Sequence, residues 1–293
     1  MKVVLRVAYD GSAFAGFQRQ PQAKTVQGTL EAAASQILGH PVGLQGAGRT
    51  DVGVHATGQI VAFTSPSVKS LVRLCHSINS VLREPKAQRY CSSIAVVEGA
   101  LLDDEDPFHP RFSATARTYS YFILDGSRPR EAMFWSGRAW CLPQTLDLEL
   151  AEEAAHLFNG ELDFSTFSYR MQEMETRVRT VSAIAIGEQK ADLLQGEAGG
   201  PRLLRLSITA NGFLRRMVRL IAAGVVEVAM GHRSLVDLQS RLQARDPSRA
   251  PHPAPPEGLY LERIVYDPDP FTTHRGTSRH ALATLPTQHR VKR

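Results

Sequence analysis

The chain has 293 residues, of which 43% are hydrophobic, a balance typical of a soluble globular protein with one large domain or two of moderate size. Its apolar runs fall well short of the roughly 20 residues that a membrane-spanning helix needs, which excludes an integral membrane protein. The first strand pattern begins at once, without the apolar region of a signal peptide, so we expect a cytoplasmic protein. The three cysteines are far apart in sequence and indicate neither a disulfide framework nor a zinc site.

The charge balance is mildly basic. The chain carries 34 lysines and arginines against 29 aspartates and glutamates, a net charge of +5, and arginine is the commoner cation. Guanidinium groups bind phosphate oxygens in a bidentate manner, so one interpretation is a phosphate-binding surface. A GC-rich genome, which favours arginine codons, explains the same composition. Composition alone does not distinguish the two explanations.

The first hundred residues predict the order β-α-β-β-α-β. Apolar residues alternate with smaller or polar ones over 5–9 and meet a turn at Asp10, which predicts a strand. Thr25 can cap a helix whose apolar residues recur at helical spacing until Gly39. The remaining elements expected in this half are strands at 42–44, 59–63 and 94–97 and a helix at 68–82.

The second half of the chain repeats this rhythm. A pair of its predicted strands forms a hairpin across a polar, glycine-rich loop, and Asn211 is expected to cap a long helix. The predicted elements are, in chain order, a strand at 117–123, a helix at 148–158, strands at 178–186 and 203–209, helices at 212–230 and 234–241, and a strand at 259–266.

These patterns predict an α+β fold of two β-α-β-β-α-β halves, each an antiparallel sheet with helices on one face. We expect an N-terminal half at 1–106 and a C-terminal half at 107–266. The proline-rich stretch 251–256 is interpreted as a linker into the last strand, and 267–293 as a flexible basic tail.

The most informative segment is 46–59, in which four glycines surround a single carboxylate, Asp51. Glycine permits positive φ and the close approach of another molecule, so this density predicts a tight loop that presents Asp51 to a ligand. The apolar run at 59–63 predicts a strand that anchors the loop. A phosphate cradle is excluded, because neither a Lys-Ser or Lys-Thr pair nor a helix pattern follows. A carboxylate that only bonds its own turn is the plain alternative.

Three further features have both a functional and a structural interpretation. Tyr119 can stack a nucleobase or simply pack, half-buried, on its strand. Arg215 and Arg219 lie one turn apart on the predicted long helix, where they can meet anionic partners or surface carboxylates. His55 has no partner at metal-ligand spacing, and we expect it to be structural.

Residues 47–56 resemble the catalytic loop of the tRNA pseudouridine synthase A family. The resemblance spans about Val3 to Tyr266, in the same order and with similar spacing. Phe17 departs from the tryptophan of many members, and the tail beyond Asp267 has no family counterpart. The other segments that agree with the family are 9–18, 112–119, 210–219 and 258–261.

This resemblance implies an enzyme that isomerises uridine to pseudouridine at positions 38–40 in the anticodon arm of tRNA, as a homodimer and without metal or organic cofactor. It implies two α+β halves, with antiparallel sheets packed side by side around a central basic cleft and helices on the outer face. Carried over to this chain, it makes Asp51 the catalytic nucleophile and Arg219 its ion-pair partner. Tyr119 aligns with the tyrosine that contacts the target uracil, and Arg49 with the arginine that helps to hold the flipped nucleotide.

Several alternatives stay open. Asp51 can attack the nucleoside or act as a base that removes a sugar proton as the uracil departs. A synthase for other uridines, in tRNA or in another RNA, and a non-catalytic RNA-binding protein are the alternative functions. A glycoside hydrolase needs two carboxylates about 5–10 Å apart, and the chain offers no convincing second acid.

Overall fold

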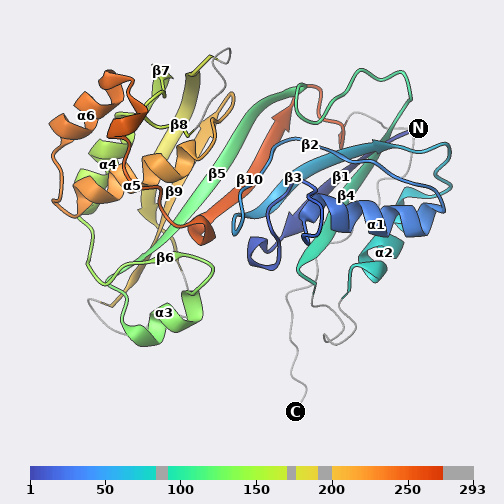
Figure 1. The fold of residues 1–293 in the computed structure, drawn as a ribbon, viewed down its shortest axis with the longest axis horizontal. Helices are drawn as coiled ribbons and strands as arrows, with labels where there is room; N and C mark the ends of the chain where they lie inside the picture. The colour runs from blue at the N-terminus through green and yellow to red at the C-terminus, as the bar shows by residue number, and fades with distance from the viewer. Residues whose placement is uncertain (84–91, 170–175, 191–199, 273–293) are drawn as a thin grey trace.

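The structure is a computed structural model that describes residues 1–83, 92–169, 176–190 and 200–272 (Figure 1). Within these ranges ten strands form one mixed sheet, and helices pack on it. The α+β class expected from the sequence is therefore confirmed.

The N-terminal half has the predicted β-α-β-β-α-β order. Thr25 caps its first helix by accepting a hydrogen bond from the Gly28 amide, and Gly39 ends that helix in the left-handed conformation. The expected strand at 42–44 lies at 45–46 instead, and the second helix starts three residues later than expected. The elements are β1 (Lys2–Tyr9), α1 (Val26–Leu38), β2 (Gln45–Gly46), β3 (His55–Thr64), α2 (Leu71–Val81) and β4 (Ile94–Leu102).

The C-terminal half contains every predicted element and three that were not predicted, α3, β6 and β7. Those three span two to seven residues each, too few for a periodic pattern to appear in the sequence. The loop of the predicted hairpin lies at 191–199, outside the described residues. The elements are β5 (Ala114–Asp125), α3 (Pro129–Trp135), β6 (Trp140–Cys141), α4 (Leu148–His156), β7 (Gly160–Asp163), β8 (Val178–Glu188), β9 (Arg202–Ala210), α5 (Met217–Ala229), α6 (Leu235–Ala244) and β10 (Leu259–Tyr266).

The long helix α5 begins later than the sequence predicted, and the predicted cap at Asn211 is wrong. Arg216, immediately before the helix, has a φ of 60°, which interrupts helical geometry. Asn211 instead joins two strands, because its side-chain oxygen accepts from the Thr180 amide and its own amide donates to the Thr180 carbonyl. Arg215 therefore lies outside the helix and does not share a helix face with Arg219.

The sheets of the two halves join edge to edge into one sheet, because the last strand lies between them. Strand β10 pairs antiparallel with β5 and, over a short stretch, parallel with β3. In Figure 1 it runs between the green β5 and the blue strands of the first half. The strand order is β4-β1-β3-β10-β5-β9-β8-β7, with β2 beside β3 and β6 beside β5.

Two large hydrophobic clusters form most of the core of the described residues, and a small third cluster gathers Leu124, Ala139 and Leu203. One large cluster packs α1 and α2 against the strands of the first half, and the other packs α4, α5 and α6 against those of the second (Figure 1). Tyr119 on β5 packs against both clusters. The aromatic residue singled out in the sequence thus lies where the two halves meet.

The expected boundary between the halves at residue 106 stays a prediction. Of the expected basic tail, residues 273–293 lie outside the described part of the chain, as does Cys91. Cys75 and Cys141 carry free thiols. In the described ranges no helix combines the length and the apolar character that crossing a bilayer requires.

Candidate active site

The loop that carries Asp51 connects β2 to β3, and the first half of the loop is hydrogen-bonded to β3. The Ala47 amide donates to the Ile60 carbonyl at 2.8 Å. The Gln59 side chain, which is completely buried, donates to the Gly48 carbonyl at 2.8 Å. Strand β3 therefore anchors the loop, as the sequence pattern suggested.

The second half of the loop is held by β1 and the segment that follows it. The Tyr9 hydroxyl hydrogen-bonds the Thr50 hydroxyl at 2.8 Å, and the Thr50 carbonyl accepts from the Phe17 amide at 3.1 Å. The Asp51 carbonyl accepts from the Val54 amide at 3.2 Å, which closes a turn. The Asp51 backbone is fixed on both sides, while its carboxylate pairs with a residue of the C-terminal half, Arg219.

Two glycines make this packing possible. A Cβ at Gly11 would lie 2.1 Å from the Val54 carbonyl oxygen, so only glycine lets the turn after β1 approach the loop. Gly53 has a φ of 81°, and a Cβ there would also meet the Pro256 ring at 2.9 Å. Glycine is required at both positions for reasons of space or backbone conformation.

The Asp51 carboxylate faces two guanidinium groups at the start of α5. Its Oδ2 lies 3.5 Å from Arg219 Nη1 and 3.9 Å from Arg216 Nε. About a third of the Asp51 side chain is exposed, whereas that of Arg219 is nearly buried. A partly exposed carboxylate with a cation on its inner side can present its other oxygen to a ligand.

Arg219 is itself held by the backbone of the proline-rich stretch. Its Nε donates to the Ala254 carbonyl at 2.6 Å, and the Ala254 amide donates to the Arg219 carbonyl at 3.1 Å. Burial lowers the pKa of Arg219 below the usual value for arginine, and the Asp51 carboxylate opposes that shift. The stretch interpreted as a linker is therefore part of the site's support.

Tyr119 lies near the carboxylate, with its ring edge-on to Phe213 at 5.0 Å between centroids. Burial raises the pKa of Tyr119 well above that of a free tyrosine, and the neighbouring Tyr9 and Asp51 raise it further against the opposing charge of Arg117. The hydroxyl is therefore protonated at neutral pH and can donate a hydrogen bond. Within the described residues no partner for this hydroxyl is found.

The structure does not bring Arg49 to the Asp51 carboxylate. Its side chain is exposed and makes no hydrogen bond or ion pair within the described part of the chain. His55, expected to be structural, is buried, stacks on Tyr260 at 4.5 Å and accepts from the Gly11 amide through Nδ1 at 3.1 Å. Three of the four predicted site residues thus cluster, and the fourth extends from the same loop.

Sequence reasoning missed Arg216, Tyr169 and Ala254. The arginine doublet before α5 includes Arg216. The helix predicted from residue 212, however, placed Arg215 one turn from Arg219 and so favoured Arg215 as the site residue. The carbon of the Arg216 guanidinium lies 4.2 Å above the centre of the Tyr169 ring. No local pattern marks Tyr169 or Ala254, because both reach the site through contacts distant in sequence.

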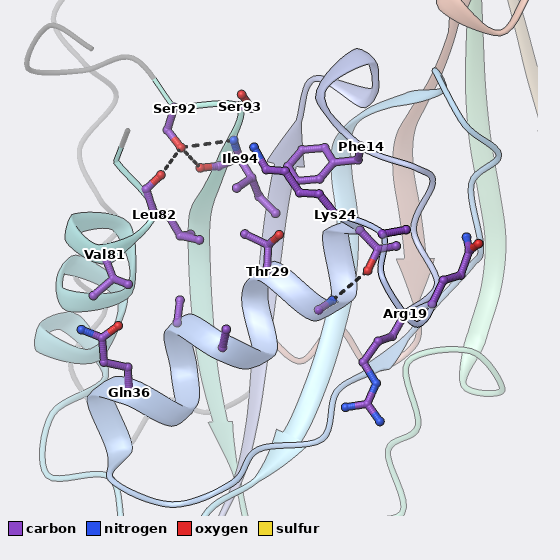
Figure 2. Close-up of a pocket in the computed structure, with 16 residues that line it drawn as sticks. Phe14, Arg19, Lys24, Thr29, Gln36, Val81, Leu82, Ser92, Ser93 and Ile94 are labelled. Carbon is purple, nitrogen blue, oxygen red and sulfur yellow. Dashed lines mark hydrogen bonds between the residues drawn. The ribbon is translucent and has the colours of Figure 1, made fainter. Parts of the chain in front are cut away.

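A pocket of about 550 Å³ lies away from Asp51, between α1, α2 and the start of β4 (Figure 2). Figure 2 shows Phe14 and Lys24 on one side of it and Val81 and Leu82 on the other. The central basic cleft implied by the family resemblance does not coincide with this pocket and stays a prediction. Among the described residues no three histidine, cysteine, aspartate or glutamate side chains gather as metal ligands would.

The fold and the site together define an α+β protein that presents one ion-paired carboxylate on a glycine-rich loop beside a half-buried tyrosine. The model of the tRNA pseudouridine synthase family matches residues 6–100 and 154–267. The chain belongs to the tRNA pseudouridine synthase family.

Three relatives that match this chain over nearly their whole length are named tRNA pseudouridine synthase A. The tRNA pseudouridine synthase A of Chromobacterium violaceum is 36% identical over 93% of this chain and 95% of that protein. Those of Yersinia pseudotuberculosis and Thermotoga petrophila are each 35% identical, over 92% and 90% of this chain and 94% and 99% of theirs. A chain from a Cbf5-Nop10-Gar1 complex matches with a TM-score of 0.31 and 13% identity, over 77% of this chain and 45% of that one, a distant similarity.

Proposed function

We propose that this protein isomerises uridine to pseudouridine in tRNA, at positions 38–40 of the anticodon arm. The observation that carries the proposal is the Asp51 carboxylate, held on its loop 3.5 Å from Arg219 and within electrostatic range of Tyr119. The names of relatives that match about nine-tenths of the chain support tRNA as the substrate.

The reaction breaks the bond between C1′ and N1 of the uracil, turns the base, and joins C1′ to C5. The hydrogen on C5 is released, and N1 gains one. A uridine inside a stem must first be flipped out, which costs a few kcal/mol. Stacking on an aromatic ring and phosphate contacts from arginines would offset this cost.

The proposed roles follow the positions of the side chains. Asp51 attacks C1′ or removes a sugar proton as the base leaves, and Arg219 orients the carboxylate. Tyr119 contacts the uracil, as an aromatic face and as a hydroxyl donor. Arg49, exposed on the same loop, helps to hold the flipped nucleotide. We further propose a cytoplasmic homodimer that needs neither metal nor organic cofactor.

The test is the release of tritium from tRNA labelled at uracil C5, with the modified positions mapped by sequencing. We expect Asp51→Asn and Asp51→Ala to lower turnover at least about 10³-fold, because each removes the reacting carboxylate. Both variants should bind tRNA with nearly unchanged affinity. Asp103→Asn removes a carboxylate from an exposed loop and serves as the matched control.

Retained turnover in Asp51→Asn would contradict the proposed mechanism. Binding of tRNA without tritium release by the unaltered protein would favour the non-catalytic RNA-binding alternative. Release mapped outside positions 38–40 would favour a synthase of different specificity.

A further inference from the structure

Arg216 has a backbone conformation that its side chain makes unfavourable. Its φ of 60° lies in the left-handed region, where a Cβ is crowded by the neighbouring carbonyl and glycine is the usual residue. The residue immediately precedes α5 and makes no side-chain cap of that helix. Such outliers persist where the surroundings hold them, and they gather at functional sites.

Two contacts hold Arg216 in place. The guanidinium carbon lies 4.2 Å from the centre of the Tyr169 ring, within the range of a cation–π interaction. The Tyr169 amide donates to the carbonyl of Arg215 at 3.1 Å, which ties the ring to the turn before the helix. The aromatic ring is therefore a fixed platform for the guanidinium.

The consequence of this placement is an unpaired donor beside the catalytic carboxylate. Arg216 Nε lies 3.9 Å from Asp51 Oδ2, too far for a hydrogen bond. The atom is buried and has no hydrogen-bond partner in the described residues. By contrast, Arg219 Nε donates to the Ala254 carbonyl. Buried donors are normally paired, so an unpaired one at a site calls for a partner that arrives with the ligand.

We propose that Arg216 is a further substrate-binding residue, whose guanidinium donates to an oxygen of the flipped nucleotide. The inference rests on the proposed function. Two acceptors have the required chemistry. One is a uracil carbonyl oxygen, which gains negative charge as the C1′–N1 bond breaks. The other is an oxygen of the phosphate that flanks the flipped nucleotide. Tyr169 acts as a positioning residue, because its ring packs against the Arg216 guanidinium.

The experiment compares Arg216→Gln, Arg216→Lys and Arg216→Gly in the full chain, with tRNA binding and single-turnover tritium release measured at several salt concentrations. Arg216→Gly accepts the left-handed backbone without strain, so its fold is protected and a loss of function reports the side chain. Arg233→Gln removes a surface cation beyond the other end of α5 and should behave as the unaltered protein.

We expect Arg216→Gln and Arg216→Gly to lower the product of affinity and rate about 10- to 100-fold, the usual effect of losing a hydrogen bond to a charged group. If the partner is a uracil carbonyl, the rate falls in all three variants while affinity and its salt dependence stay unchanged. If the partner is a phosphate, affinity falls, the salt slope decreases by about 1, and Arg216→Lys recovers much of the affinity.

Unchanged rate, affinity and salt slope in Arg216→Gly, with an active unaltered protein, would overturn the inference and leave the proposed function intact. An unaltered protein that binds tRNA but releases no tritium would instead refute the proposed function. Tyr169→Leu adds a second measurement, because it leaves Arg216 present without its platform. We expect a smaller loss of the same kind, and a normal rate and affinity there would remove the positioning role.

Discussion

The Asp51 carboxylate is oriented by a chain of contacts and not by burial. Arg219 supplies the cation, and its guanidinium is held by the bond from Nε to the Ala254 carbonyl. The Ala254 amide donates to the backbone carbonyl of Arg219, which ties the two backbone segments together. A guanidinium is planar and offers donors in a fixed geometry, which an ammonium group does not. The orientation of Asp51 therefore depends on the shape of Arg219 as well as on its charge.

We expect Arg219→Lys to lower turnover about 10- to 100-fold while tRNA affinity changes much less. The substitution keeps the positive charge but loses the contact with the Ala254 carbonyl, and the loss of such a charged hydrogen bond accounts for this magnitude. Single-turnover rates and binding constants, measured on the same preparations, separate the two effects. Equal losses in rate and affinity would contradict an orienting role.

His55 contributes to stability in a pH-dependent way. Burial lowers the pKa of its imidazole below 6.5, although the nearby Asp10 carboxylate opposes the shift. The unfolded chain therefore takes up a proton near pH 6.5, whereas the folded protein does so only at lower pH. The free energy of unfolding consequently decreases as pH falls below about 6.5, and the decrease ends at the folded pKa.

The variant His55→Asn should lose less stability on acidification than the unaltered protein. Asparagine can keep an acceptor for the Gly11 amide but carries no titrating group. The difference between urea unfolding curves at about pH 7.5 and about pH 5.5 should be smaller for the variant, by at most about 1.4 kcal/mol per pH unit. Parallel pH dependences would show that His55 does not titrate in this range.

At the scale of elements, the loop that carries Asp51 is held in place by the neighbouring strands. Strand β3 binds its first half, and β1 with the following segment binds its second half. The turn at Gly11 lies against the Val54 carbonyl, so the space there is already filled. A change in that turn is transmitted to the loop through direct contact.

Gly11→Ala tests this coupling. Its Cβ would lie 2.1 Å from a carbonyl oxygen, so the loop backbone must move. We expect a loss of about 1–3 kcal/mol in the free energy of unfolding, as in overpacked cores, together with at least a tenfold loss of turnover. Gly43→Ala is the matched control, because a Cβ there meets nothing within 4 Å. If the destabilised Gly11→Ala variant kept normal turnover, the position of the loop would not depend on the turn at Gly11, and the predicted coupling would be wrong.

At the scale of the whole molecule, β10 makes one sheet out of two halves. A polar network also crosses three neighbouring strands, since Arg205 on β9 pairs with Glu262 on β10 at 2.5 Å and donates to Ser120 on β5 at 2.8 Å. Asp51 belongs to the first half and Arg219 to the second. The site therefore exists only when the halves are joined.

Binding of tRNA should depend strongly on salt. The chain has a net charge of +5, and each phosphate contact releases counterions from the RNA. We expect affinity to fall at least about tenfold between roughly 50 and 200 mM salt, measured by filter binding or fluorescence anisotropy. A flat response would contradict a surface that follows phosphates.

Much of this protein could be predicted from local patterns. The helix at 26–38, the last strand and the presentation of Asp51 on a glycine loop were predicted correctly. Caps, hydrophobic periodicity and glycines specify local structure within a few residues. The start of α5 could not be predicted, since no local sequence pattern marks Arg216 as left-handed. The support from Ala254 could not be predicted either, because it comes from backbone groups of Ala254.

The sequence by itself determined the α+β class, the order of the main elements and the presentation of Asp51 on a glycine-rich loop. Only the tertiary structure decided which cations meet that carboxylate and how the halves are joined. The pair of Asp51 and Arg219 spans 168 positions along the chain, and that of Arg219 and Ala254 spans 35. Contacts of this kind depend on the packing of the whole core, which no pattern within one helix or strand contains.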